Sequence, residues 1–235
     1  MNKKLAGLVE RLKEAHKDRL VSVILYGSAA SGDHHEKFSD LNVFCVLTDI
    51  RASDLAHSEP IFKWWRDLSN SAPLLMSEDE VRTSTDCFPI EFHDMRERRR
   101  VLYGKDVIDG LEIDRTFYRA QIEHDLRSKL IRLRQKAGGV LSDSKALLRL
   151  MLDSVSTFCV LARHALLVGG GDVGWQKRDI ANKLGELGAD PAPIRTLLDL
   201  REEKKDDTTV EPAALFEAYL KEIEAIVAYV DRLPK

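Results

Sequence analysis

The hydrophobic pattern of this chain changes near Asp114 and divides its 235 residues into two parts. Before Asp114, segments with helical spacing alternate with short apolar runs that are typical of strands. After Asp114, every long segment has helical spacing, and none shows a sustained two-residue alternation. We therefore predict an α/β (α+β) domain with a mixed sheet over residues 1–110 and an all-α helical bundle over residues 111–235.

The same pattern predicts individual elements. A helix over 3–17 leads into a first strand that ends at Gly27. The second strand is apolar on both faces, which is typical of a central strand covered on two sides. The four predicted strands are 21–26, 41–47, 73–76 and 88–92. The helices predicted for the second half are 114–137, 142–168, 176–187, 191–203 and 212–232.

Composition excludes several classes of protein. The net charge of −3 and the pI near 6.2 disfavour a basic nucleic-acid-binding protein. The three cysteines are widely spaced in apolar runs, and the first residues lack the apolar core of a signal peptide, so we expect a cytoplasmic protein. We expect no membrane span, because charged residues interrupt the apolar stretch 146–168. The tryptophan pair at 64 and 65 is compatible with a homodimer.

Two short motifs provide the candidate chemistry. Gly27 and Ser28 follow the first strand, where a glycine allows close approach of a ligand and a helix start offers N–H groups to a phosphate. Asp40 and Asn42 open the second strand and, two residues apart, point to the same face. If the strands are neighbours, these oxygens face the Gly27-Ser28 turn. Mg²⁺ prefers such hard oxygen ligands together with substrate phosphates.

The segment from Leu25 to Leu47 resembles the signature of the DNA polymerase β-like nucleotidyltransferase superfamily. The resemblance rests on two motifs, Tyr26-Gly27-Ser28 and Ser39-Asp40-Leu41-Asn42. Asp40 follows Ser28 by twelve residues. The helical second half is similar in kind to that of the aminoglycoside adenylyltransferase branch. The resemblance implies a Mg²⁺-dependent enzyme that transfers a nucleoside monophosphate from an NTP, first of all ATP, to a hydroxyl of a small molecule.

The resemblance also implies site residues. Glu91, within an apolar segment predicted as a strand, corresponds to the third carboxylate and would act as the general base. Metal ligands would come from Asp40, Asn42 and Glu91, and the nucleotide would be bound by Gly27 and Ser28. Lys177 and Arg178 begin a predicted helix of the second half and are candidates for phosphate contacts.

Asn42 departs from the family pattern, which has a second aspartate at this position. An amide keeps an oxygen ligand but removes a negative charge from the metal site. Two readings therefore stay open: a nucleotidyltransferase, or a weakened or inactive nucleotide-binding protein that acts as a sensor. A third reading is purely structural, since Asp and Asn often satisfy local backbone groups in turns.

Overall fold

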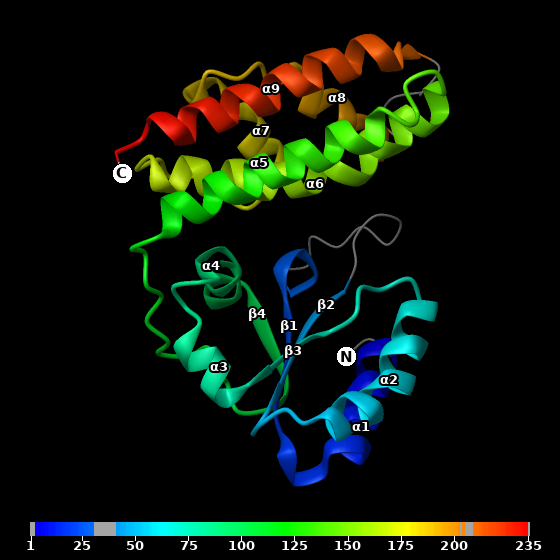
Figure 1. Cartoon of the computed structure of the whole chain (residues 1–235), viewed down its shortest axis with the longest axis vertical. Coiled ribbons are helices and arrows are strands. Elements are labelled where there is room, and N and C mark those ends of the chain that lie inside the picture. The colour runs from blue at the N-terminus through cyan, green and yellow to red at the C-terminus, as the bar shows by residue number, and fades with distance from the viewer. Residues whose placement is uncertain (1–2, 31–40, 203, 205–208, 235) are drawn as a thin grey trace. The chain divides into compact units, whose positions relative to one another are not determined.

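The computed structural model describes residues 3–30, 41–202, 204 and 209–234. The chain divides into two compact units, Met1–Arg115 and Thr116–Lys235 (Figure 1). The first unit combines a sheet with helices, and the described part of the second contains helices and connecting segments. The predicted fold class, a mixed-sheet domain followed by a helical domain, is confirmed.

The first unit is built on a sheet of four strands. Their order is β3-β2-β1-β4, with β1 antiparallel to β2 and β4 and with β2 parallel to β3. The sheet is therefore mixed, and β2 is a central strand, as its apolar sequence predicted. The strands are β1 (Leu20–Tyr26), β2 (Asn42–Leu47), β3 (Leu74–Ser77) and β4 (Arg99–Gly104).

Helices cover both faces of this sheet, and alternate residues of β2 point into two separate cores (Figure 1). On one face, Val43, Cys45 and Leu47 pack with residues of α1 (Lys3–His16) and α2 (Ala52–Asp67). On the other face, Phe44 and Val46 pack with α3 (Glu78–Thr83) and α4 (Pro89–Glu97). Burial on both faces explains why β2 lacks a polar alternation.

The predicted strand over 88–92 is wrong, because this segment forms the first part of α4. A short apolar run does not distinguish a strand from a buried helix. Pro89 stands at the start of α4, where its fixed φ suits the first helical turn and its missing N–H has no cost. Ile90, Phe92, His93 and Met95 are then buried on one side of the helix.

The fourth strand, β4, is not among the predicted strands. It contains two arginines and lies at the edge of the sheet, beside β1. An edge strand is stabilised by backbone pairing along one side and often carries charged side chains, so its apolar pattern is weak. Its pairing places Arg99 opposite Tyr26 and Val101 opposite Ile24.

The second unit is a helical bundle (Figure 1). Three long helices pack against one another, and two shorter helices pack against α6. Asp143 and Glu211 cap two of the long helices, because their carboxylates accept hydrogen bonds from the N–H groups of Ala146 and Ala214. The predicted helix 176–187 is divided into α7 and a short 3-10 turn, Leu184–Leu187. The helices are α5 (Tyr118–Ala137), α6 (Ser144–Val168), α7 (Lys177–Asn182), α8 (Ala192–Arg201) and α9 (Pro212–Arg232).

Among the described residues, α6 is the one helix that is long and apolar enough to cross a membrane by length and composition. The expectation that its charged residues exclude this by composition was therefore too strong. Of its most apolar window, 56% is buried inside the protein, and the core helix of a soluble protein has the same length and composition. These two properties of the helix are thus weak evidence for a membrane span.

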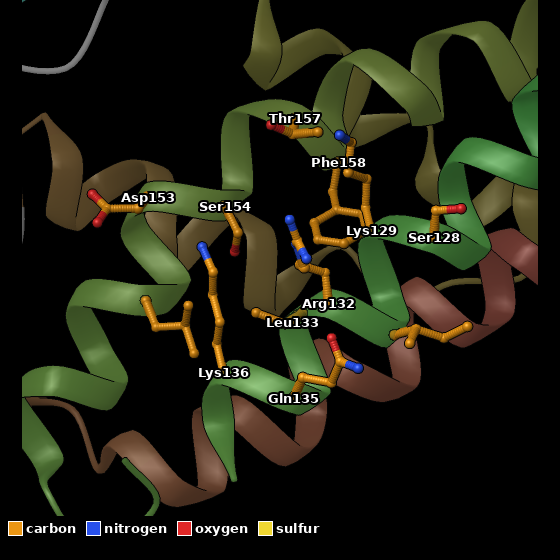
Figure 2. Close-up of a pocket in the computed structure, with 12 residues that line it drawn as sticks. Ser128, Lys129, Arg132, Leu133, Gln135, Lys136, Asp153, Ser154, Thr157 and Phe158 are labelled. Carbon is orange, nitrogen blue, oxygen red and sulfur yellow. The ribbon is translucent and has the colours of Figure 1, made fainter. Parts of the chain in front are cut away.

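A cavity of about 650 Å³ lies in the second unit between α5 and α6 (Figure 2). Its lining comes from the second half of α5 and the middle of α6. Both buried apolar side chains, such as Leu133 and Phe158, and exposed polar side chains contribute to it.

Candidate functional site

The turn after β1 requires a glycine. Gly27 has a φ of +74°, a conformation that side chains with a Cβ rarely adopt, and it begins the short 3-10 turn η2 (Gly27–Ala30). Its N–H donates to the carbonyl of Arg98 at 3.2 Å, which ties the turn to the segment before β4. The backbone of Ser28 belongs to this turn, whereas its side chain lies outside the described part of the structure.

Asn42 lies beside this turn. It begins β2 and is directly opposite Tyr26, the last residue of β1. A Cβ added at Gly27 would be 3.3 Å from Nδ2 of Asn42, so the amide group borders the turn. The antiparallel pairing of β1 with β2 thus brings together two of the residues singled out in the sequence, Gly27 and Asn42. Asp40 lies outside the described residues, and its role as a metal ligand stays a prediction.

Glu91 lies in the first turn of α4 rather than on a strand. The next residue, Phe92, packs edge to face on Phe44 of β2, with ring centroids 6.5 Å apart and planes at 83°. Phe44 is two residues beyond Asn42, so both side chains point to the same face of the sheet. Helix α4 therefore covers the face toward which Asn42 points.

The electrostatics of Tyr26 support this placement of Glu91. Burial raises the pKa of Tyr26 to about 12, and the negative charges of Glu91 and Asp94 contribute to the rise. Both carboxylates are therefore near enough to Tyr26 to act on its hydroxyl, at the end of β1 where Gly27 follows. The site at this end of the sheet combines a glycine turn, an amide and two carboxylates, all within the first unit.

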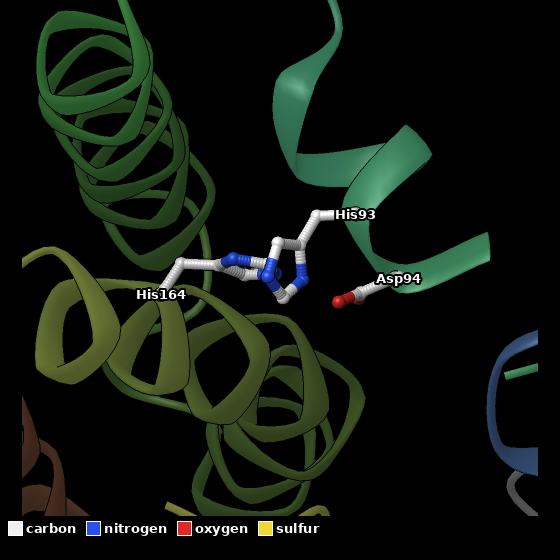
Figure 3. A group of neighbouring side chains, drawn as sticks. All are labelled: His93, Asp94 and His164. Carbon is white, nitrogen blue, oxygen red and sulfur yellow. The ribbon is translucent and has the colours of Figure 1, made fainter. Parts of the chain in front are cut away.

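Asp94 is a residue that the sequence interpretation missed. In a strand, Glu91 and Asp94 would point to opposite faces, whereas three residues apart on a helix they lie on the same side. The signal that could have found Asp94 is Pro89, since a proline followed by an acidic residue is typical of a helix start. Figure 3 shows Asp94 and His93 on α4.

The histidines His93 and His164 have partners inside their own units. On α4, Nε2 of His93 lies 3.3 Å from Oε1 of Glu97, one helical turn away. On α6, which Figure 3 also draws, Nδ1 of His164 is hydrogen-bonded to the hydroxyl of Tyr118, and the two rings meet edge to face. These contacts support a structural role for each histidine within its own unit.

The two basic candidates of the second unit begin α7. The guanidinium of Arg178 forms ion pairs with Asp199 at 2.8 Å and with Glu202 at 2.7 Å. Hydrogen bonds to Glu202 and Asp199 raise the pKa of Arg178, so its charge is already balanced inside this unit. Lys177 lies near the buried Cys159: burial raises the pKa of that thiol to about 12, and the charge of Lys177 opposes the rise.

Comparison with known proteins supports the fold. No family model and no curated protein matches this chain. The chain is similar to a solved structure of the spectinomycin adenyltransferase AAD(9) from Enterococcus faecialis with ATP and spectinomycin. The TM-score is 0.63 at 12% sequence identity, and the match covers 99% of this chain and 100% of the other. This likeness confirms the fold that the resemblance implied, a mixed-sheet domain followed by a helical domain.

A toxin–antitoxin structure with AMP-PNP also matches. Its TM-score is 0.32 at 15% identity, and the match covers 61% of this chain and 98% of the other. A TM-score this low supports no conclusion about fold or function.

Proposed function

We propose that this protein is a nucleotidyltransferase that transfers a nucleoside monophosphate from an NTP to a hydroxyl group of a small molecule. The observation that carries the proposal is the meeting of the Gly27 turn, Asn42 and the acidic side of α4 at one end of the sheet. The donor to test first is ATP, because the adenyltransferase of similar fold was solved with ATP.

In the proposed reaction, the turn at Gly27 and Ser28 binds the triphosphate. A residue without a side chain at position 27 allows a phosphate to approach the backbone closely. Glu91 takes the proton of the acceptor hydroxyl, whose oxygen forms a bond to the α-phosphorus. The bond from the α-phosphorus to the bridging oxygen breaks, and pyrophosphate leaves with both electrons of that bond.

The donor set fits a magnesium ion in kind, because the carboxylate of Glu91 and the amide oxygen of Asn42 are hard oxygen ligands. Asp40 is the further ligand expected from the sequence. A bound Mg²⁺ would neutralise charge on the triphosphate and on the leaving pyrophosphate. Magnesium dependence, a cytoplasmic location and a homodimer remain predictions.

The missing charge at Asn42 weakens this metal site. A pair of unit charges about 4 Å apart interacts with about 4 kcal/mol at an effective dielectric constant of about 20. We infer that Asp94, one helical turn after Glu91, offsets part of this loss, because its charge also acts on Tyr26 at the same end of the sheet. One ion is then easier to hold than two.

Lys177 and Arg178 of the second unit differ in how they could contact a phosphate of the nucleotide. Arg178 would have to exchange its ion pairs with Asp199 and Glu202 for a phosphate. Lys177 is the first residue of the same helix, and its contact with a phosphate stays a prediction from the sequence.

The alternative function is a nucleotide-binding protein without turnover, which acts as a sensor. The observation that favours it is Asn42, which leaves the site with less negative charge than two divalent ions require. The two functions differ in their need for Mg²⁺, since a site that only binds nucleotide can do so through the glycine turn and basic groups.

Calorimetric titration of ATP, with Mg²⁺ and with EDTA, tests both functions without knowledge of the acceptor. For a nucleotidyltransferase we expect Mg²⁺-dependent binding that Asp40→Ala abolishes and that Asp67→Ala preserves. Asp67 is a suitable control because it is an exposed carboxylate at the end of α2. Binding that ignores both Mg²⁺ and Asp40→Ala supports the sensor, and absence of binding contradicts both functions.

A further inference from the structure

The cavity between α5 and α6 has a cationic wall. Lys129, Arg132 and Lys136 line it and follow one another at intervals of three and four residues, which places all three on one stripe of α5. Figure 2 shows the three side chains reaching from α5 toward α6. All three residues are exposed, and among the described residues none of them forms an ion pair.

Like charges three and four residues apart on a helix repel one another. Elsewhere on α5 this repulsion is relieved by acidic partners: Arg127 pairs with Glu123, and Arg134 pairs with Glu224 of α9. The cationic stripe that faces the cavity lacks such partners within the described chain. Its charge is therefore available to an anion.

The opposite wall, from α6, combines apolar and polar side chains. Its hydroxyl groups come from Ser154 and Thr157. The one acidic residue of the lining, Asp153, is held by its own helix, because Nε of Arg149 lies 2.9 Å from its carboxylate. The lining thus carries three cations against one carboxylate that is already paired.

The cavity also has an apolar part. Leu133 and Phe158 are buried in the lining, and Ile131 is an apolar side chain that is 54% exposed there. A volume of about 650 Å³ is far larger than an inorganic anion needs and is in the range of pockets for small organic ligands.

We propose that this cavity binds a small organic phosphate, with its phosphate on the stripe of Lys129, Arg132 and Lys136 and its apolar part against Leu150 and Ile131, the apolar side chains of the lining that are not buried. A phosphate monoester carries nearly two negative charges at neutral pH. It therefore matches three cations better than a ligand with one carboxylate group, which carries a single charge. This site lies wholly in the second unit and does not depend on the proposed transferase activity.

The two hydroxyl groups of the α6 wall have different parts in this site. The hydroxyl of Thr157 would donate a hydrogen bond to a phosphate oxygen. The hydroxyl of Ser154 already donates to the carbonyl of Met151 and lies 3.1 Å from the hydroxyl of Tyr219. We therefore assign no hydrogen bond between Ser154 and the phosphate.

The test uses phenyl phosphate and inorganic phosphate as probes, in EDTA, with the full-length protein. Calorimetry measures affinity, and amide shifts in NMR spectra locate the site. We expect phenyl phosphate to bind more tightly than inorganic phosphate and to shift amides within 128–136 and 150–158. The double variant Lys129→Gln/Arg132→Gln should weaken phenyl phosphate binding by about tenfold, the loss expected for two exposed charged contacts.

A control variant separates this cavity from the remaining cationic sites of the protein. Lys221→Gln removes an exposed cation of α9 that is paired with Glu217, and it should leave the affinity for phenyl phosphate unchanged. Amide shifts confined to 128–136 and 150–158, without shifts around Gly27, distinguish this cavity from the proposed triphosphate site. The proposal is overturned if phenyl phosphate does not bind at millimolar concentration, binds no better than inorganic phosphate, or binds the double variant as tightly as the wild type.

Discussion

Phe92 of α4 meets Phe44 of β2 edge to face, and this contact holds the acidic side of α4 over the end of the sheet. Phe44 points to the same face as Asn42, and Glu91 precedes Phe92. The packing of two aromatic rings in the core therefore positions a carboxylate near the glycine turn. Edge-to-face pairs of this kind add to the stability gained from burial alone.

Asn42→Asp should increase the affinity for ATP in the presence of Mg²⁺. The substitution keeps the size of the side chain beside Gly27 and adds a negative charge to the proposed metal site. Calorimetry with Mg²⁺ and with EDTA measures the change, and only the Mg²⁺-dependent part should increase. Asn182→Asp is the control, because Asn182 is an exposed residue at the end of α7 whose side-chain oxygen accepts a hydrogen bond from Nε of Arg195, as a carboxylate also would. Equal or lower affinity in Asn42→Asp would show that this position does not hold a metal.

Glu91→Gln should weaken Mg²⁺-dependent ATP binding, because it removes a negative charge from the proposed metal site, and at saturating ATP it should lower turnover by about a hundredfold or more, as expected when a general base is removed. The amide retains the size of the carboxylate but does not accept the proton of an acceptor hydroxyl. Release of pyrophosphate measures turnover. The wild type is first assayed with a panel of small hydroxyl compounds to find an acceptor, and the variant is then assayed with that acceptor. Glu97→Gln, at the end of the same helix, is the comparison for effects on α4 itself. Unchanged turnover in Glu91→Gln would remove Glu91 from the reaction.

Gly27→Ala should destabilise the protein and weaken ATP binding. A residue with a Cβ at a φ of +74° costs about 1–2 kcal/mol, and the added methyl would also press on Asn42. Gly110→Ala is the matched control, because Gly110 has a φ of +68° and nothing within 4 Å of an added Cβ. Chemical denaturation should show a loss for both variants and a larger one for Gly27→Ala. Only Gly27→Ala should lose ATP affinity, and an equal loss in Gly110→Ala would argue against a binding role of the turn.

Glu222→Gln should stabilise the protein increasingly as the pH rises from 5 to 8. Burial raises the pKa of Glu222 to about 9, against a lowering by the backbone N–H of Ile194 and a further rise from Asp190. The folded state holds this proton more tightly than the unfolded chain does. The stability that protonated Glu222 contributes is therefore complete below about pH 4.5 and is lost as the pH rises toward 9. The loss reaches about 3 kcal/mol at neutral pH, whereas glutamine does not titrate.

Denaturation of wild type and Glu222→Gln at several pH values measures this difference. Glu217→Gln on the same helix should show no such gain, because its hydrogen bond to Lys221 lowers the pKa of Glu217 instead. A difference between wild type and Glu222→Gln that stays constant from pH 5 to 8 would contradict a buried neutral carboxyl group.

The sequence by itself predicted the elements whose side chains are buried with a clear period. The long helices of the second unit and the central strand β2 were predicted correctly, because burial on one side of a helix or on both faces of a strand leaves an apolar pattern. The Gly27 turn was also recognised, since its backbone conformation restricts the choice of residue.

Tertiary structure decided what depends on neighbours far away in the sequence. The segment at Glu91 is a helix because Phe92 and Met95 fit against the sheet, and β4 is a strand because β1 offers it backbone partners. The meeting of Gly27 with Asn42 depends on the register of two strands, and the cationic cavity depends on how α5 packs on α6. A local pattern carries no information about such pairings, because their free energy comes from contacts that form only when distant segments come together.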